Sequence, residues 1–283
     1  MKWLAGLRVV TMALNLPGPV ACARLRDLGA RVTKVEPAAG DPFEGYCPAW
    51  YARLHAGMAV HRLDLKSDTG ARAMEALLAD ADLFVAAQRP SALARLRLDA
   101  ASLAARHPRL CVLAITGHAA PGEETAGHDL TYLAAHGLVQ PPALPATLFA
   151  DMAGAERVVS TALALVHARD RTGAGQSSAV PLAEAAAFLA QPLAHDLTRP
   201  GGVLGGGLAA YNLYETREGW IAVAALEPHF ARRLAEALGV DARDRGALAA
   251  RFASETAAHW ERWARGLDLP LVAVRPLPDQ DPT

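Results

Sequence analysis

Short apolar runs alternate with longer amphipathic segments through the first half of the chain. Three apolar runs predict buried strands, at residues 7–10, 83–87 and 110–115, and the segment 31–36, between Gly29 and Pro37, predicts a fourth strand. Helices are predicted between them, at residues 20–28, 67–79 and 98–105, with Ser67 as an N-cap. Because consecutive parallel strands need crossover connections, this strand–helix–strand order favours a parallel sheet covered by helices.

The pattern changes in the second half. A long apolar helix is expected at residues 152–168, then a Gly-containing turn at 171–176 and an alanine-rich helix at 182–193. The Pro- and Gly-rich stretch 200–207 is the strongest linker signal, so we place a domain boundary there, giving residues 1–200 and 201–283. The smaller domain is expected to be α+β, with a hairpin at 211–225, helices at 228–238 and 247–265, and a strand at 270–274.

Composition narrows the classes of protein. At 283 residues, 52% of them hydrophobic, the chain can bury one large domain and a smaller one. Its net charge of −1 provides no basic field for nucleic acid, and no apolar run has membrane-spanning length. The three cysteines lack metal-site spacing, and the start of the chain lacks a signal-peptide pattern. We therefore expect a cytoplasmic protein that binds neither nucleic acid nor membrane.

The predicted sheet also indicates where a ligand would bind. Doubly wound sheets bind ligands at the carboxyl ends of their strands, so the loops after Val10, Glu36, Ala87 and Ile115 are expected to carry function. The first of these loops, Leu-Pro-Gly-Pro at residues 16–19, cannot supply the Gly-x-Gly-x-x-Gly fingerprint of dinucleotide sites. NAD binding is therefore not expected.

Three ionisable residues stand in distinctive surroundings, namely His128, Asp151 and Glu227. His128 follows a glycine and precedes Asp129, Asp151 opens an apolar helix, and Glu227 precedes a proline at a predicted helix start. Each has a structural alternative: a hydrogen-bonded surface histidine, an N-capping aspartate and a glutamate stabilised by the helix dipole. The residues alone leave these alternatives open.

The order and spacing of several segments resemble the family III CoA-transferases (CaiB/BaiF), and within them the α-methylacyl-CoA racemase branch. These segments are residues 4–10, 16–19, 27–30, 34–37, 63–66, 127–129, 151–154, 171–176 and 224–230. The resemblance implies a Rossmann-like parallel-sheet domain with a smaller α+β domain, and it marks residues 63–66 as a further strand. It implies a CoA thioester as substrate and no other cofactor.

The resemblance also assigns chemistry. His128 would be the base that takes the α-proton, Asp151 the acid that returns a proton on the opposite face, and Glu227 the support of His128. The apolar neighbours of Asp151 would raise its pKa enough for that role. Transferases of the family more often carry tyrosine where His128 stands, and use the aspartate as a nucleophile that forms an aspartyl-CoA intermediate. Racemase, CoA-transferase and a non-catalytic or partner-dependent member remain three hypotheses.

CoA binding and assembly complete the expectations. Arg89 matches an arginine of the family, and we expect Lys34 and Arg62 to join it in binding the CoA phosphates. Residues 56–61 lack the basic cluster usual before Leu-Asp-Leu-Lys, which predicts weaker CoA binding. Family members form interlocked dimers through a C-terminal segment that the sequence up to Thr283 does not show. We expect a homodimer or a complex with a companion subunit, with Gly206 and Gly207 forming either a loop over the acyl-CoA or a plain linker.

Overall fold

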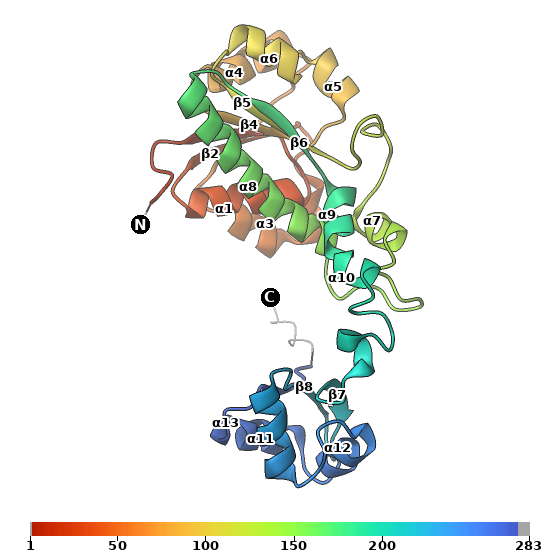
Figure 1. Cartoon of the computed structure of the whole chain (residues 1–283). Helices are drawn as coiled ribbons and strands as arrows, with labels where there is room; N and C mark the ends of the chain where they lie inside the picture. Colours follow the sequence, from red (N-terminus) through yellow and green to blue (C-terminus); the bar gives the residue numbers. More distant parts are fainter. Residues whose placement is uncertain (1, 277–283) are drawn as a thin grey trace. The chain divides into compact units, whose positions relative to one another are not determined.

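The structure, a computed structural model, describes residues 2–276 and divides into two compact units, Met1–Ala190 and Gln191–Thr283 (Figure 1). The boundary that we expected after residue 200 therefore lies inside the second unit. The Gly-rich stretch belongs to that unit as well, where Val203–Gly207 forms a short irregular helical turn.

The first unit is built on a six-stranded sheet in the order β3-β2-β1-β4-β5-β6. Every neighbouring pair is parallel, which confirms the predicted Rossmann-like parallel sheet. The strands are β1 (Arg8–Thr11), β2 (Arg31–Glu36), β3 (Ala59–Arg62), β4 (Leu83–Ala86), β5 (Cys111–Thr116) and β6 (Ser177–Pro181). The strand order reverses between β1 and β4, where such sheets form a crevice at their carboxyl edge.

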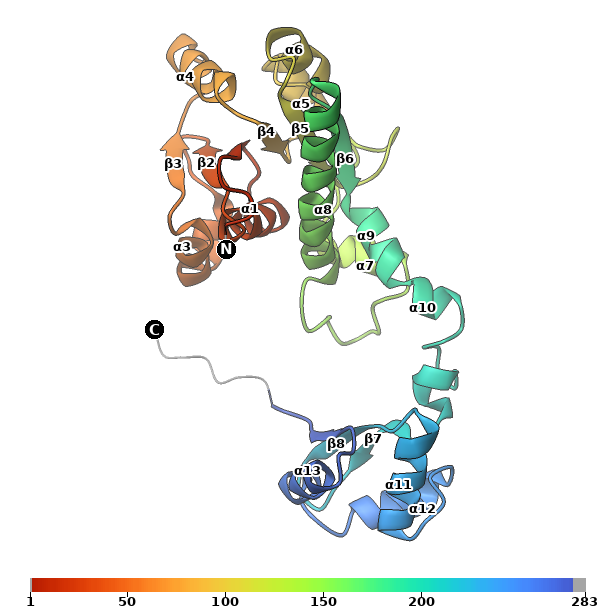
Figure 2. The same ribbon diagram turned by 60° about the vertical axis from the view of Figure 1, so that its left-hand side comes forward.

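Helices cover both faces of this sheet (Figures 1 and 2). They are α1 (Pro17–Asp27), α2 (Pro42–Tyr46), α3 (Pro48–His55), α4 (Asp68–Ala79), α5 (Pro90–Arg95), α6 (Ala100–Arg106), α7 (Asp129–Ala135), α8 (Phe149–Thr172) and α9 (Leu182–Leu189). On one face Val9, Cys22 and Val158 share a core with α1 and α8. On the other, Val10 and Phe84 pack against α4, α5 and α6. Strand residues alternate between the two cores because side chains alternate across a strand.

Edge strands account for the errors of strand prediction. β6 was not predicted, because its first three residues are exposed polar or small residues on the last strand of the sheet. The strand expected at 63–66 is wrong, since the strand of this region, β3, ends at Arg62, and all four residues of β3 are exposed at the opposite edge. Edge positions lack the apolar signature of buried strands, so the hydrophobic pattern is weak there. The Ser67 N-cap is confirmed, since its hydroxyl accepts a hydrogen bond from the Gly70 N–H.

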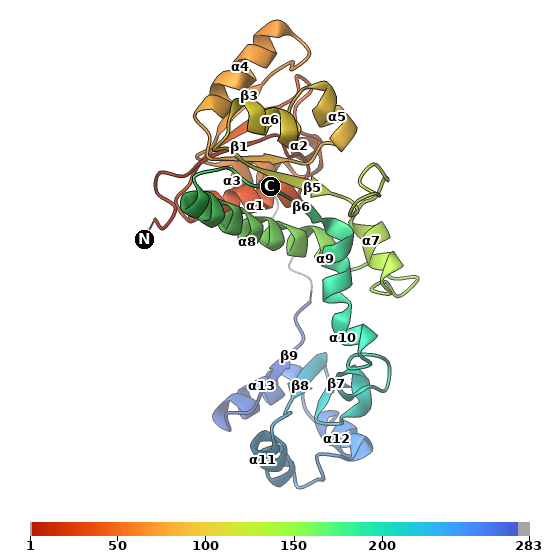
Figure 3. The same ribbon diagram turned by 45° about the horizontal axis from the view of Figure 1, so that its top comes forward.

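The second unit has a three-stranded antiparallel sheet, β7 (Tyr211–Glu215), β8 (Trp220–Ala224) and β9 (Leu271–Ala273), shown in Figure 3. Its helices are α10 (Gln191–Ala194), α11 (Pro228–Leu238), α12 (Arg245–Phe252) and α13 (Ala257–Gly266). The helix expected over 247–265 is two helices, because Thr256 caps a new one at Ala257. Tyr214, Phe252 and Trp260 stack in the core of this unit, which confirms the small α+β domain.

Candidate active site

Two adjoining cavities open at the carboxyl edge of the parallel sheet. The larger, of about 590 Å³, lies beyond the ends of β1, β2 and β3 and has mainly apolar walls. The smaller, of about 240 Å³, lies beyond the ends of β4 and β5. Gln88 lines both, so together they run along most of this edge. The loops that we expected to carry function, after Val10, Glu36, Ala87 and Ile115, contribute to their walls.

His128 lines the smaller cavity from the residue that precedes α7. The His128 side chain is exposed. The Thr131 hydroxyl accepts a hydrogen bond from the His128 N–H at 3.0 Å and donates one to the His128 carbonyl at 2.7 Å. The hydroxyl of Thr131 thus anchors the backbone at the helix start and leaves the imidazole available to a ligand in the cavity. The sequence pattern did not predict α7, which is only seven residues long.

Asp151 lies half-buried in the first turn of α8. The N-cap of α8 is Leu148, so the alternative that made Asp151 an N-cap is wrong. The Asp151 N–H instead donates to the carboxylate of Asp129 at 3.0 Å, and Asp129 is 4% exposed. Because Asp129 directly follows His128, this hydrogen bond connects the two predicted catalytic residues through one intervening side chain.

The surroundings of Asp151 change its acidity. Burial, and secondarily the negative charge of Asp129, raises the pKa of Asp151 from 3.8 to about 7. Burial and the charges of Asp151 and Asp129 also raise the pKa of Tyr132, which therefore stays a neutral phenol. Tyr132 lines the smaller cavity next to His128. Near neutral pH, Asp151 can therefore both donate and accept a proton.

This pKa makes a prediction for stability. The pKa of Asp151 is 3.8 in the unfolded chain and about 7 in the folded chain. The contribution of this group to the free energy of unfolding is therefore fully present below pH 3.8 and is lost as pH rises to about 7. Wild-type stability should fall by up to ~1.4 kcal/mol per pH unit between pH 3.8 and about 7 on its account. Asp151→Asn removes this slope. The free energy of unfolding of the variant, measured in urea, should therefore rise relative to that of wild type between pH 4 and pH 8. Glu156→Gln, an exposed change on the same helix, is the control, and equal slopes in all three proteins would contradict the assignment.

Glu227 lies in the second unit, at the residue that precedes α11, with Pro228 in the first turn. Its side chain is exposed and makes no capping hydrogen bond. His128 and Asp151 belong to the first unit. Of the three predicted catalytic residues, His128 and Asp151 therefore lie in the same unit, linked through Asp129, and Glu227 lies in the other unit.

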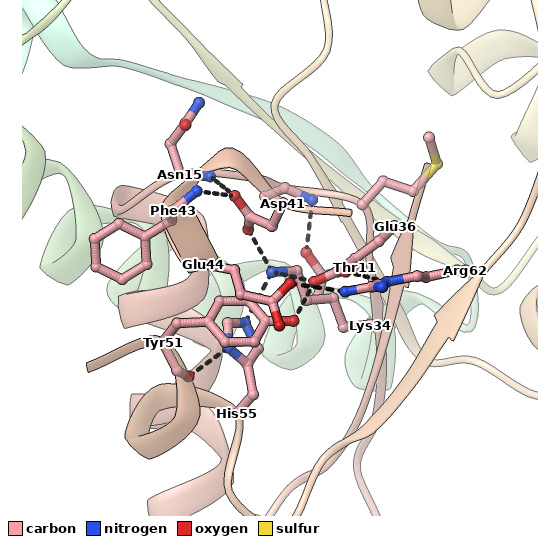
Figure 4. Close-up of polar contacts among 12 residues, drawn as sticks. Thr11, Asn15, Lys34, Glu36, Asp41, Phe43, Glu44, Tyr51, His55 and Arg62 are labelled. Carbon is pink, nitrogen blue, oxygen red and sulfur yellow. Dashed lines mark hydrogen bonds and ion pairs between the residues drawn. The ribbon is translucent and has the colours of Figure 1, made fainter. Parts of the chain in front are cut away.

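Lys34 does not have the position expected of a phosphate ligand. Its side chain is 1% exposed, and its ammonium lies 2.5 Å from Asp41 Oδ2, 2.8 Å from His55 Nε2 and 3.1 Å from Glu36 Oε1 (Figure 4). An ammonium has three donors, and these three partners use all of them. The sequence-based assignment of Lys34 to the CoA phosphates is therefore corrected: Lys34 belongs to an internal ion-pair network.

The partners of Lys34 are in matching protonation states. Burial and the Lys34 charge lower the pKa of His55, whose Nδ1 donates to the Tyr51 carbonyl at 2.7 Å, so Nε2 is free to accept from Lys34. Although burial opposes it, hydrogen bonds from Tyr51 and Lys34 and the Lys34 charge hold the pKa of Glu36 below its usual value. Glu36, Asp41 and His55 also have metal-ligand geometry, with ligand atoms within 4.8 Å of one another. Because all three contact the Lys34 ammonium, that ammonium supplies the cation of this cluster.

The remaining cations are distributed differently from the expectation. Arg62 has a half-exposed side chain paired with Glu44 at 2.7 Å and Glu36 at 3.5 Å, so carboxylates already offset its charge (Figure 4). Arg89 is exposed and lines the smaller cavity with His128. Lys66 lines the larger cavity and was missed as a ligand-binding candidate, although it ends the Leu-Asp-Leu-Lys segment.

Thr116, at the end of β5, is a second residue that sequence analysis missed. It lines the smaller cavity, is 7% exposed, and its hydroxyl has no hydrogen-bond partner among the described residues. A buried hydroxyl without a partner is unfavourable, so a polar ligand group that bonded it would be favoured. Sequence patterns cannot reveal such a hydroxyl, because its lack of a partner is a property of the packed structure.

The chain is an α/β protein that combines a six-stranded parallel sheet in Rossmann order with a second α+β unit, and His128 lines a cavity at the carboxyl edge of the sheet. The family model of CoA-transferase family III matches residues 4–280, so the chain belongs to that family. This confirms the family resemblance drawn from the sequence segments.

Individual relatives include enzymes of two kinds. The chain is 31% identical to human alpha-methylacyl-CoA racemase over 84% of this chain and 65% of that protein. It is 30% identical to a succinate–glutarate CoA-transferase of Agrobacterium fabrum, over 84% of this chain and 67% of that protein. The chain thus spans about two thirds of the length of these curated relatives. At about 30% identity over most of this chain, both relatives support the family assignment.

Solved structures show the same fold. A hypothetical protein of Mycobacterium tuberculosis superposes with a TM-score of 0.86 at 24% identity, covering 98% of this chain and 85% of that one. A CaiB/BaiF family protein of Brucella suis superposes with a TM-score of 0.79 at 23% identity, covering 97% and 84%. Within residues 2–276, no helix is long and apolar enough to cross a membrane.

Proposed function

We propose that the chain binds an acyl-CoA thioester and racemises or epimerises its α-carbon by two-base proton transfer. One observation carries this proposal: the half-buried Asp151, with its pKa raised to about 7, is hydrogen-bonded to the residue that follows His128. A carboxyl group that is half protonated near neutrality, and linked through Asp129 to a histidine that lines a cavity, is suited to moving protons to and from carbon.

In the proposed reaction, the neutral imidazole of His128 takes the α-proton of the thioester. The electron pair of the C–H bond becomes an enolate, with the negative charge on the thioester oxygen. Protonated Asp151 then delivers a proton to the opposite face of the same carbon, which leaves an imidazolium and a carboxylate. The reverse direction exchanges the two roles, so each residue must be able to hold a proton near neutral pH.

The two adjoining cavities suggest how an elongated CoA thioester would lie. The larger, mainly apolar cavity suits the adenosine end, with Lys66 on its wall as a phosphate partner. The smaller cavity beside His128 suits the thioester, with Arg89 and Thr116 on its walls. In this arrangement Gln88 lies between the two ends of the ligand, since it lines both cavities.

The alternative is a CoA-transferase that moves CoA between carboxylic acids through Asp151. The names of several relatives favour it, including succinate–glutarate and cinnamoyl-CoA:phenyllactate CoA-transferases. Asp151 would attack the thioester carbonyl as a carboxylate, releasing CoA thiolate and forming an acyl anhydride that the thiolate then converts to aspartyl-CoA and free acid. A chiral 2-methylacyl-CoA in heavy water separates the two: α-deuterium uptake without an acceptor acid supports racemisation, whereas acid-dependent exchange and a hydroxylamine-trapped Asp151 support transfer. A third possibility, a non-catalytic or partner-dependent member, would show neither.

Assembly is part of the proposal. Glu227 is exposed in the second unit, and we propose that it supports His128 of a second copy in a homodimer, or of a companion subunit. Sedimentation of the active protein should therefore give a dimer or larger species, and Glu227→Gln should lower exchange about 10-fold or more. Glu218→Gln, an exposed change in the β7–β8 turn, serves as the control. A fully active monomer would contradict this assembly.

A further inference from the structure

We propose that Asp129 is a positioning residue, whose buried carboxylate holds the first turn of α8, and with it Asp151, in place against the helix that begins after His128. This inference deepens the proposed function and rests on it. Asp129 neither lines the two cavities nor belongs to the proposed acid–base pair, His128 and Asp151.

The first support is the hydrogen bond itself. The N–H groups in the first turn of a helix have no partners within the helix, and Asp151 contributes one of them. Leu148, the N-cap of α8, cannot supply a side-chain acceptor. Asp129, 22 positions earlier in the chain, supplies it at 3.0 Å. A carboxylate at a helix start is also favoured by the helix dipole, so this contact fixes α8 relative to α7.

The second support is burial. Asp129 is 4% exposed and lies at the first residue of α7, whereas its neighbour His128 is exposed at the cavity. A buried carboxylate is retained only where its interactions offset its desolvation. Small movements of α8 would carry Asp151 away from the substrate carbon, and an error of 1 Å in a catalytic group can lower a rate about 100-fold.

The charge of Asp129 has a consequence beyond geometry. Together with burial, it raises the pKa of Asp151, which keeps this residue partly protonated at neutral pH. The other elements packed against α8 bring few charged groups that would lower the pKa of Asp151. On α9 the one charged side chain is Glu184, which pairs with Arg157 at 3.7 Å, and on α7 Tyr132 is a neutral phenol. The charged residues of α1 lie at its C-terminal end, away from the carboxyl edge where α1 and α8 begin.

Two substitutions separate position from charge. Asp129→Asn keeps an oxygen acceptor for the Asp151 N–H but removes the charge, whereas Asp129→Ala removes both. Carboxyl ¹³C NMR of the ligand-free proteins measures the Asp151 titration directly, whatever reaction the protein catalyses. In Asp129→Asn we expect this titration, and the pH–rate profile of deuterium exchange, to move to lower pH by roughly one unit. At pH 7 that leaves about one-fifth of the protonated Asp151 of wild type.

In Asp129→Ala we expect the same pKa change together with a melting temperature lower by about 2–4 °C and an exchange rate lower by on the order of 100-fold. Restoration of most of that rate by Asp129→Asn at a suitably lower pH supports a positioning role. An unchanged Asp151 titration in Asp129→Asn, or equal rates in wild type and Asp129→Ala, would overturn the inference. A wild type without exchange would instead reject the proposed proton transfer, while the ligand-free titration would still decide whether Asp129 controls Asp151.

Discussion

Replacing His128 with alanine is expected to reduce α-deuterium exchange by about 100- to 10,000-fold, because a positioned general base contributes that much to a proton transfer. The imidazole lines the smaller cavity, and the His128 atoms that bond the Thr131 hydroxyl are its backbone N–H and carbonyl, so its loss should leave α7 intact. Binding of the acyl-CoA should change little, since the larger cavity, with Lys66, is untouched. The measurement is the rate of deuterium uptake from heavy water by a 2-methylacyl-CoA, with its dissociation constant determined in parallel.

The matched control for this experiment is His136→Ala, which removes an imidazole at the other end of the same short helix. It should keep wild-type exchange. If His128→Ala also kept it, the proton-transfer assignment would fail. Covalent trapping at Asp151 that survives in His128→Ala, in a wild type that shows no exchange, would establish the transferase alternative.

Buried elements of the fold were predictable from the sequence, and exposed ones were not. β4 and β5 were predicted to within a residue at each end, because four or five consecutive apolar residues mark a strand covered on both faces. β2 was predicted with its observed bounds from its position between the stop at Gly29 and Pro37, although its sequence RVTKVE has only two apolar residues. The edge strands β3 and β6 carry no such mark, and the five-residue helix α2 is too short for a helical period to emerge. Hydrophobic periodicity reports burial, so prediction failed where burial was slight.

In the candidate site, residues marked by a sequence motif were predictable, and contacts that depend on the packed structure were not. The motif identified His128 and Asp151, and the structure places both near Asp129 at the carboxyl edge. Lys34 was misassigned because a lysine near the carboxyl end of a predicted strand resembles a ligand-binding cation, whereas one of its carboxylate partners, Asp41, comes from a loop whose path the sequence does not reveal. Pairing between Lys34 and Asp41 depends on how the chain turns after β2, which is a tertiary property.

Removal of Lys34 should produce the largest loss of stability of any change considered in this protein. The ammonium neutralises Glu36 and Asp41, whose side chains are 0% exposed. In Lys34→Met both carboxylates would remain buried next to each other without their cation, and breaking a buried ion pair from one side costs about 3–5 kcal/mol. Asp41 also accepts the Asn15 and Phe43 N–H groups, so the loss should extend to the loops after β1 and β2.

The control is Arg62→Met, which removes a cation from the same network but at its exposed side. Arg62 pairs with Glu44 and Glu36 while half in water, so its removal should cost only about 0–1 kcal/mol. Urea unfolding at pH 7 measures both variants. The triple change Lys34→Met, Glu36→Gln and Asp41→Asn should recover part of the loss, because it removes the unpaired charges as well as their partner. Equal stability of Lys34→Met and Arg62→Met would mean that the buried ammonium does not neutralise this cluster, and would reopen the question of which cation Glu36, Asp41 and His55 hold.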